Sequence, residues 1–222
     1  MNRVRLHSQV LIPTIAIVVL LAVGLAWVGG ARVRNEVATS DRFWQLASFH
    51  GASGPRFDTL DGLVSASDVV VLGRITSVQP GRIFGAPHAD NPDPASEQIH
   101  YVAVTVKVDR ILYGALVDPA ASDLTLEMPV SGPDVIPQLA KSVPPELSVM
   151  FLFNAGLSAA AHGLPDDIQA RESKYYALLA FGAVMRDIGG APRVADAVEL
   201  GFLTAFESGS FDAFVRRVEA VR

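Results

Sequence analysis

The sequence contains no cysteine among its 222 residues. This absence excludes disulfide frameworks, zinc sites with thiolate ligands, cysteine nucleophiles and the acylated cysteine of a lipoprotein. A surplus of positive charge is also missing, because 18 basic residues stand against 23 acidic ones. Proteins that bind nucleic acid generally carry a basic face, so we expect no nucleic-acid partner. Charged residues make up only 18% of the chain and apolar residues 50%, which excludes disorder over most of its length.

The familiar catalytic and cofactor motifs are missing from the sequence as well. No serine stands in a G-x-S-x-G elbow, and the nearest run, 51–55 (GASGP), lacks the last glycine. There is neither a glycine-rich phosphate loop after a predicted strand nor an H-E-x-x-H motif. Helix-borne metal ligands need a regular spacing that none of the histidines has: His7, His50, His88, His100 and His162. We therefore predict no catalytic, cofactor-binding or metal-binding residue, and the sequence favours a protein without enzymatic activity.

One polar cluster lies in a long predicted loop over residues 79–100. Carboxylates and imidazoles there offer ligands for a divalent cation: His88, Asp90, Asp93, Glu97 and His100. Pro92 and Pro94 interrupt the cluster, and the central glycine of an EF-hand loop is absent. We interpret this segment as a solvated acidic loop.

A second long predicted loop, residues 155–174, contains the adjacent carboxylates Asp166 and Asp167. A glycosidase would need a second carboxylate about 5–10 Å away across a cleft. A helical turn that starts at Pro165 explains the pair more simply, because negative charge is favourable at a helix N-terminus.

A long hydrophobic run is present near the N-terminus. Val10 to Ala31 forms 22 residues without a charge, preceded by Arg3 and Arg5. As a helix this run spans about 33 Å, enough for the roughly 30 Å hydrocarbon core of a bilayer. We predict a signal anchor or transmembrane helix within residues 1–31 that contacts the bilayer through residues 10–31. The alternative is a cleaved secretory signal, whose cleavage site would use the small residues 29–31 (GGA).

The positive charges on the two sides of this run balance, so they do not orient it. Two arginines and the terminal amine precede it, and three arginines follow it closely: Arg32, Arg34 and Arg42. The character of the following domain favours a cytoplasmic N-terminus. We predict a single-pass protein of the cell membrane with an extracytoplasmic domain, or a secreted domain if the signal is cleaved.

Residues 32–60 have the composition of a juxtamembrane stalk. They mix charges with glycine and proline around one apolar cluster: Phe43, Trp44, Leu46 and Phe49. Such a cluster can dock on the domain, lie at the membrane surface or contact a partner. We expect it to dock on the domain.

From residue 61 the apolar residues repeat with a period of 2, and residues 61–194 are predicted to form a β domain. Val102, Val104, Val106 and Val108 show the clearest alternation. The last predicted strand bends near Gly182 and leads into a hairpin turn over residues 187–190. The predicted strands are 68–78, 102–108, 124–128, 147–153 and 175–186. Five or six short, mostly antiparallel strands indicate a small OB-like barrel.

Residues 195–222 are predicted to be helical. Asp196 and Glu199 resemble a capping box for a helix that stops at Gly209. Ser210 can cap a second helix. This helix carries an apolar stripe of Phe211, Phe214, Val215, Val218 and Val221. We expect the stripe to pack on the barrel, with partner or membrane-surface binding as the alternative. The predicted fold is mainly β with C-terminal α: a transmembrane helix, a small antiparallel OB-like barrel, and one or two C-terminal helices.

Three sequence runs resemble a known family. They are 67–75 (SDVVVLGRI), 104–114 (VTVKVDRILYG) and 149–153 (VMFLF). Together, over residues 61–155, they resemble OB-like domains of secreted or membrane-tethered bacterial proteins, similar in layout to netrin-like modules and tissue inhibitors of metalloproteinases. The resemblance implies a barrel in a secreted or membrane-tethered setting. It does not imply protease inhibition, because every cysteine of the animal modules is absent.

These observations favour a membrane-anchored protein whose extracytoplasmic domain is a non-catalytic binding or assembly module, with a protein partner in the cell envelope and no cofactor. Two alternatives stay open. One is an envelope hydrolase whose acid and base groups are brought together only by the fold. The other is an accessory subunit of a membrane complex that uses the transmembrane helix itself.

Overall fold

A computed structural model describes residues 37–47, 55–85, 98–180, 182–195 and 200–221 of the chain. The predicted transmembrane segment, Phe49 and loop residues 88–97 lie outside these described residues. Contacts divide the chain into two units, Met1–Ala38 and Thr39–Arg222. Within the described part, no helix is both long enough and apolar enough to cross a bilayer.

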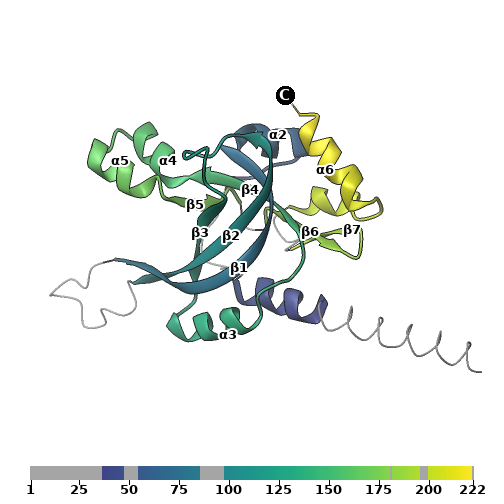
Figure 1. The fold of residues 1–222 in the computed structure, drawn as a ribbon, viewed down its shortest axis with the longest axis horizontal. Helices are drawn as coiled ribbons and strands as arrows, with labels where there is room; N and C mark the ends of the chain where they lie inside the picture. The colour runs from purple at the N-terminus through teal and green to yellow at the C-terminus, as the bar shows by residue number, and fades with distance from the viewer. Residues whose placement is uncertain (1–36, 48–54, 86–97, 181, 196–199, 222) are drawn as a thin grey trace, which may run out of the picture. The chain divides into compact units, whose positions relative to one another are not determined.

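The second unit is mainly β and contains a seven-stranded sheet (Figure 1). Its strands are β1 (Val69–Phe84), β2 (Ile99–Gly114), β3 (Asp123–Val130), β4 (Ser148–Asn154), β5 (Tyr175–Leu178), β6 (Val184–Ile188) and β7 (Ala191–Val194). Their order in the sheet is β1-β2-β3-β5-β4-β6-β7. The first part of β1 also pairs with β4, over residues 69–73. The pairing of β3 with β5 is parallel and the others are antiparallel, which confirms the mostly antiparallel sheet.

Short helices connect and flank these strands. They are α2 (Leu60–Ala66), α3 (Ile136–Lys141), α4 (Ala155–Ala161), α5 (Asp166–Glu172) and α6 (Phe211–Glu219), with 3₁₀ turns at η1 (Pro133–Val135) and η2 (Gly201–Phe206). Residues 37–47 are also helical. The Ser210 hydroxyl caps α6 by accepting from the Ala213 N–H, as predicted. The helix predicted to start at Asp196 differs, because residues 201–206 form the 3₁₀ turn η2 and residues 196–199 lie outside the described residues.

Alternation along the strands creates two separate apolar clusters. Val69 and Val71 of β1 face one cluster, which also contains Phe43 and Trp44 from the helical residues 37–47. Val70 faces the other cluster, where the strands meet α2 and α6. Successive side chains of a strand point to opposite faces, so one strand can contribute to both clusters. The predicted stripe of α6 is buried in the second cluster, which confirms that it packs on the sheet.

The apolar cluster of the predicted stalk docks on the domain, as expected. Phe43 has none of its surface exposed and Trp44 only 5%. The sequence placed the start of the folded domain at residue 61, whereas the contacts place Thr39 in the same compact unit as the sheet. The reason is the burial of Phe43 and Trp44 in the apolar cluster of the strands.

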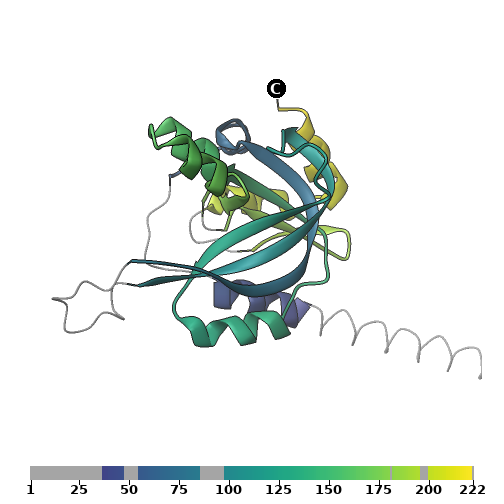
Figure 2. The ribbon, with the colours of Figure 1, turned by 60° about the vertical axis from the view of Figure 1, so that its left-hand side comes forward.

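Both long predicted loops contain more regular structure than the sequence suggested. β1 continues to Phe84 through Pro80, and β2 begins at Ile99, so the two strands form a long hairpin (Figure 2). A register shift between Pro80 and Ile83 accommodates the proline, which is tolerated in strands at such bulges. The second loop holds α4 and α5. The predicted strand 175–186 is divided into β5 and β6, and the hairpin turn between β6 and β7 lies where it was predicted.

Candidate functional site

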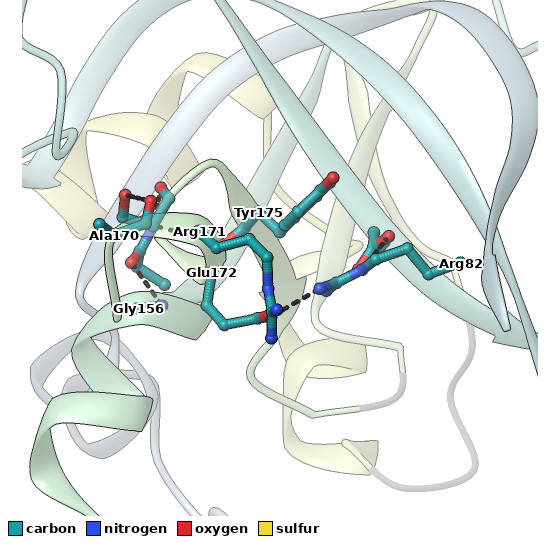
Figure 3. Close-up of polar contacts among 9 residues, drawn as sticks. Arg82, Gly156, Ala170, Arg171, Glu172 and Tyr175 are labelled. Carbon is teal, nitrogen blue, oxygen red and sulfur yellow. Dashed lines mark hydrogen bonds and ion pairs between the residues drawn. The ribbon is translucent and has the colours of Figure 1, made fainter. Parts of the chain in front are cut away.

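The far end of β1 carries an arginine that binds two carboxylates from distant parts of the chain. The Arg82 Nε donates to both carboxylate oxygens of Glu127 in β3, at 2.9 Å each. Its Nη2 also pairs with Glu127. Its Nη1 donates to Oε2 of Glu172, the last residue of α5, at 2.6 Å, and Figure 3 shows the two side chains pointing toward each other. We call Arg82, Glu127 and Glu172 the arginine cluster.

Local backbone geometry brings Arg82 within reach of Glu127. Gly81 lies so close to β2 that a Cβ atom there would be 2.8 Å from the Tyr101 carbonyl oxygen. The absence of a side chain therefore lets the bulged end of β1 cross close over β2. In β3, Glu127 stands between the buried residues Leu126 and Met128, so its side chain points to the opposite face of the sheet. Arg82 contacts it there, and Glu127 is only 4% exposed.

Aromatic rings flank the Arg82 guanidinium on two sides. Its central carbon lies 3.9 Å from the centre of the Tyr175 ring and 4.8 Å from the centre of the Phe84 ring. Phe84 in turn makes an edge-to-face contact with Tyr101 in β2, with ring centres 5.1 Å apart. A cation over a ring face is attracted to it, so the rings and the carboxylates both stabilise the positive charge of Arg82.

The electrostatics of this cluster fix its charge state. Burial alone would lower the pKa of Arg82, but the hydrogen bonds to Glu127 and Glu172 raise it above its ordinary value. Burial would raise the pKa of Glu172, but its hydrogen bonds from Arg82 and Arg171 lower it. The pKa of Tyr101 is raised, first by burial and then by the charge of Glu127. Arg82 therefore holds its proton throughout the physiological range and is suited to positioning and recognition rather than proton transfer.

Beside the arginine cluster, the end of the hairpin exposes large apolar side chains. Ile83 is 57% exposed, Phe84 42% and Ile99 43%. Phe84 and Ile99 are partners in the β1–β2 register and share one face of the hairpin, whereas Ile83 is the partner of His100 and points to the other face. We call Phe84 and Ile99 the hairpin patch. Neighbouring strands hold their backbones, and the arginine cluster ties the end of β1 to β3 and α5.

A pocket of about 220 Å³ lies elsewhere on the domain. Its apolar floor includes Leu124 and Tyr176, and the charged side chains of Asp118, Asp123 and Lys174 also line it. The Tyr176 hydroxyl accepts a hydrogen bond from the Val117 N–H at 2.9 Å. Both aspartates already accept hydrogen bonds from neighbouring residues of the same loop.

Of the candidate residues from the sequence that the structure describes, none belongs to the arginine cluster or lines the pocket. His100 is half-buried in β2, opposite Ile83 and Val130, while the other members of its predicted loop cluster lie outside the described residues. Asp166 and Asp167 are exposed in the first turn of α5, which confirms the helix-start interpretation. Within the described part of the chain, no three histidine, aspartate or glutamate side chains gather as metal ligands would.

Sequence reasoning did not identify the arginine cluster. Arg82 fell in a predicted loop, and Glu172 lies 90 positions away from it. One signal was available. Glu127 alternates with the apolar residues of a short predicted strand, which places a carboxylate on the second face of the sheet.

The fold and the arginine cluster define a mainly β domain with C-terminal helices and a charge-paired, aromatic-flanked hairpin end. No known protein family matches the sequence, no curated protein matches it, and no solved structure matches the fold.

Proposed function

We propose that the chain is a single-pass membrane-anchored protein whose extracytoplasmic β domain is a non-catalytic binding or assembly module. The membrane anchor rests on the hydrophobic run of residues 10–31, and the observation that carries the binding module is the hairpin patch. Large apolar side chains gathered on an exposed, well-braced hairpin generally serve interaction. The arginine cluster supports this view, because it places a fixed charge and aromatic rings directly beside the patch.

The strand order supports an OB-like barrel for this module. β1, β2, β3, β5 and β4 pair in turn, and β1 pairs again with β4. Every strand of this set therefore has two strand neighbours, which is the arrangement that removes sheet edges. In the chain, α3 follows β3 and precedes β4. This order of elements, together with the strand order, is consistent with the netrin-like layout suggested by the sequence.

A protein of the cell envelope is the partner that the patch suits best. Its two apolar side chains, Phe84 and Ile99, would be buried by a complementary apolar surface, and the adjacent arginine and aromatic side chains are residue types enriched in protein interfaces. The net charge of −5 disfavours a polyanionic ligand.

Crosslinking in intact cells tests the proposal. The tagged full-length chain serves as bait, and a version that begins at Arg32 and is fused to an unrelated anchor serves as the comparison. A partner captured by both versions supports binding by the β domain. Capture by the full-length chain alone would assign binding to the transmembrane helix, as expected of an accessory subunit. No specific capture by either version would contradict the binding module.

Point variants sharpen this test. We expect Phe84→Ser combined with Ile99→Ser to abolish capture by the β domain, because the partner would lose its apolar contact. Leu157→Ser is a matched control, because Leu157 is 49% exposed but lies on α4, outside the hairpin patch. Equal capture by both variants would place the binding surface elsewhere.

The pocket supports the alternative of an envelope hydrolase, because it gathers carboxylates and an amine around an apolar floor. Assays of the purified chain against ester, peptide and glycoside substrates test this alternative. Activity that disappears in both Asp118→Asn and Asp123→Asn would favour the hydrolase over the binding module.

A further inference from the structure

Helical residues 39–47 are joined to the sheet by a buried polar contact. The Ser40 hydroxyl donates to Oε1 of Glu146, which precedes β4. Arg186 of β6 donates from Nη1 to the Ser40 Oγ at 2.7 Å and from Nη2 to the Asp41 carboxylate at 2.8 Å. Its Nη1 is also 3.8 Å from Glu146. We call these four residues the clasp and residues 39–47 the latch.

The clasp is largely removed from water. The side chain of Arg186 is 7% exposed and that of Glu146 is 10% exposed, whereas that of Asp41 is 45% exposed. The Arg186 Nε is buried without a hydrogen-bond partner in the described part of the chain. The two buried ions are thus held by a small number of contacts, and three of the four contacts of the clasp involve a latch residue.

The apolar and polar parts of the latch oppose each other energetically. Burial of the Phe43 and Trp44 side chains stabilises the docked latch, because it removes their apolar surface from water. Docking also removes Arg186 and Glu146 from water, and the desolvation of a buried ion pair can exceed its Coulombic gain. Opening the latch returns both ions to water. The cost of opening is therefore smaller than the buried apolar surface alone would suggest.

We propose that the latch opens independently of the rest of the domain and so sets how far the domain reaches from the membrane. This inference rests on the proposed membrane anchor. With the latch docked, seven residues separate Ala31 from Thr39, which allows a separation of at most about 25 Å. With the latch open, the next described residue packed on the domain is Phe57, and the 25 residues between it and Ala31 can span at most about 90 Å.

The groups around Glu146 give the opening a pH dependence. They are Ser40 and Asp41 from the latch and Arg186 from β6, while Arg74 of β1 reaches the neighbouring Pro145 carbonyl and pairs with Asp109. Burial raises the pKa of Glu146 and outweighs the lowering effect of the Ser40 hydrogen bond and the Arg186 charge. The docked state therefore binds the proton more tightly than the open state. Acid closes the latch, and ionisation of Glu146 at higher pH favours opening.

Thiol labelling of the full-length chain in lipid vesicles tests the latch, because the natural sequence has no cysteine. Ala47→Cys places a thiol in the latch, and Ala180→Cys places one in the second apolar cluster; the two alanines are 7% and 3% exposed. Each rate is divided by the rate of the same variant in denaturant at the same pH. We expect Ala47→Cys to react at least tenfold faster than Ala180→Cys. Equal rates would show that residues 39–47 open only when the whole domain unfolds, which would overturn the proposal.

The pH dependence separates the clasp from general fraying. We expect the corrected Ala47→Cys rate to fall as the pH is lowered from 8 to 5. The fall should be up to about tenfold for each pH unit that lies between the higher pKa of Glu146 in the docked state and its pKa in the open state. Glu146→Gln, which stays neutral, should keep the slow rate at every pH. A rate that does not depend on pH, or a fast rate for Glu146→Gln, would overturn the role of the clasp.

These outcomes do not depend on whether a partner exists. Labelling reports the attachment of the latch in the isolated chain, whereas crosslinking reports binding by the hairpin patch. Failure of the binding proposal with successful labelling would leave the latch intact.

Discussion

The Arg82 guanidinium pairs with the Glu127 carboxylate across an intervening strand. Arg82 lies in β1 and Glu127 in β3, with β2 between them, and both Nε hydrogen bonds measure 2.9 Å. The pair fixes how the end of the long hairpin lies over the sheet. It therefore links the position of the hairpin patch to the stability of the domain.

Loss of the arginine should be costly because it leaves a buried carboxylate without its cation. We expect Arg82→Met to lower the free energy of unfolding by about 3–5 kcal/mol. Urea titration of the purified chain measures this change. Arg193→Met is the matched control, because Arg193 pairs with Glu207 at the surface and should change stability by less than about 1 kcal/mol. A loss of equal size in the two variants would contradict the special role of Arg82.

Adding a second substitution should recover much of that loss. In Arg82→Met combined with Glu127→Met, the buried Glu127 carboxylate is removed together with its cation, and apolar side chains of similar volume replace the pair. Glu172 loses Arg82 but keeps its ion pair with Arg171. The double variant should be more stable than Arg82→Met alone in the same urea titration. A double variant that is less stable would show that the two residues act independently.

Glu172 should contribute stability that is lost in acid. Its pKa is lowered in the folded chain from the ordinary value of 4.5, so the unfolded chain takes up the proton first as the pH falls. The contribution is therefore full above pH 4.5 and declines below it. We expect the stability difference between the natural chain and Glu172→Gln to shrink from pH 6 to pH 3. A difference that stays constant over this range would contradict the ion pair with Arg82.

Tyr101 should ionise at higher pH than an ordinary tyrosine. Burial raises its pKa above 10.0, and the Glu127 charge adds to the effect while Arg82 opposes it. Absorbance titration of the natural chain, with Tyr101→Phe subtracted, isolates this phenol. Glu127→Gln should bring its pKa back toward the ordinary value. Because the unfolded chain ionises first, stability should fall as the pH rises through the interval between the two values.

Asn154 should be the most sensitive cap in the domain. Its side-chain oxygen accepts from the N–H groups of Gly156 and Leu157, and its Nδ2 donates to the Ser173 carbonyl. The residue is fully buried, so Asn154→Ala leaves several polar groups unsatisfied and should cost about 3 kcal/mol. Ser210→Ala, which removes one exposed cap, should cost about 1 kcal/mol. Thermal unfolding followed by circular dichroism compares the two variants.

The strands were predictable where one face is apolar and the other polar. The alternation from Val102 to Val108 marks β2 because the period of 2 is set by the backbone itself. Ser210 likewise identified the start of α6 through its capping chemistry. The sequence reasoning ended β1 too early, because Pro80 and Gly81 are typical turn residues. A bulge accommodates Pro80 in the strand, and the close approach of β1 to the β2 backbone requires glycine at position 81.

The arginine cluster and the clasp could not be predicted, because their members are far apart in the chain. Arg82 and Glu172 are separated by 90 positions, and Ser40 and Arg186 by 146. Local patterns show that a charged residue lies in a strand or a loop, but not which distant group meets it. Pairings of this kind depend on the strand order, which only the three-dimensional fold defines.

The separation of 146 positions between Ser40 and Arg186 also has a kinetic consequence for biosynthesis. A ribosome delivers residues 39–47 well before β6, so Phe43 and Trp44 lack many of their native neighbours while the intervening strands are being made. Domains dominated by such non-local pairings have a high contact order and fold in milliseconds to seconds rather than microseconds. A nascent chain truncated before Arg186 should therefore be sensitive to proteases, and a chain that extends through residue 221 should be resistant.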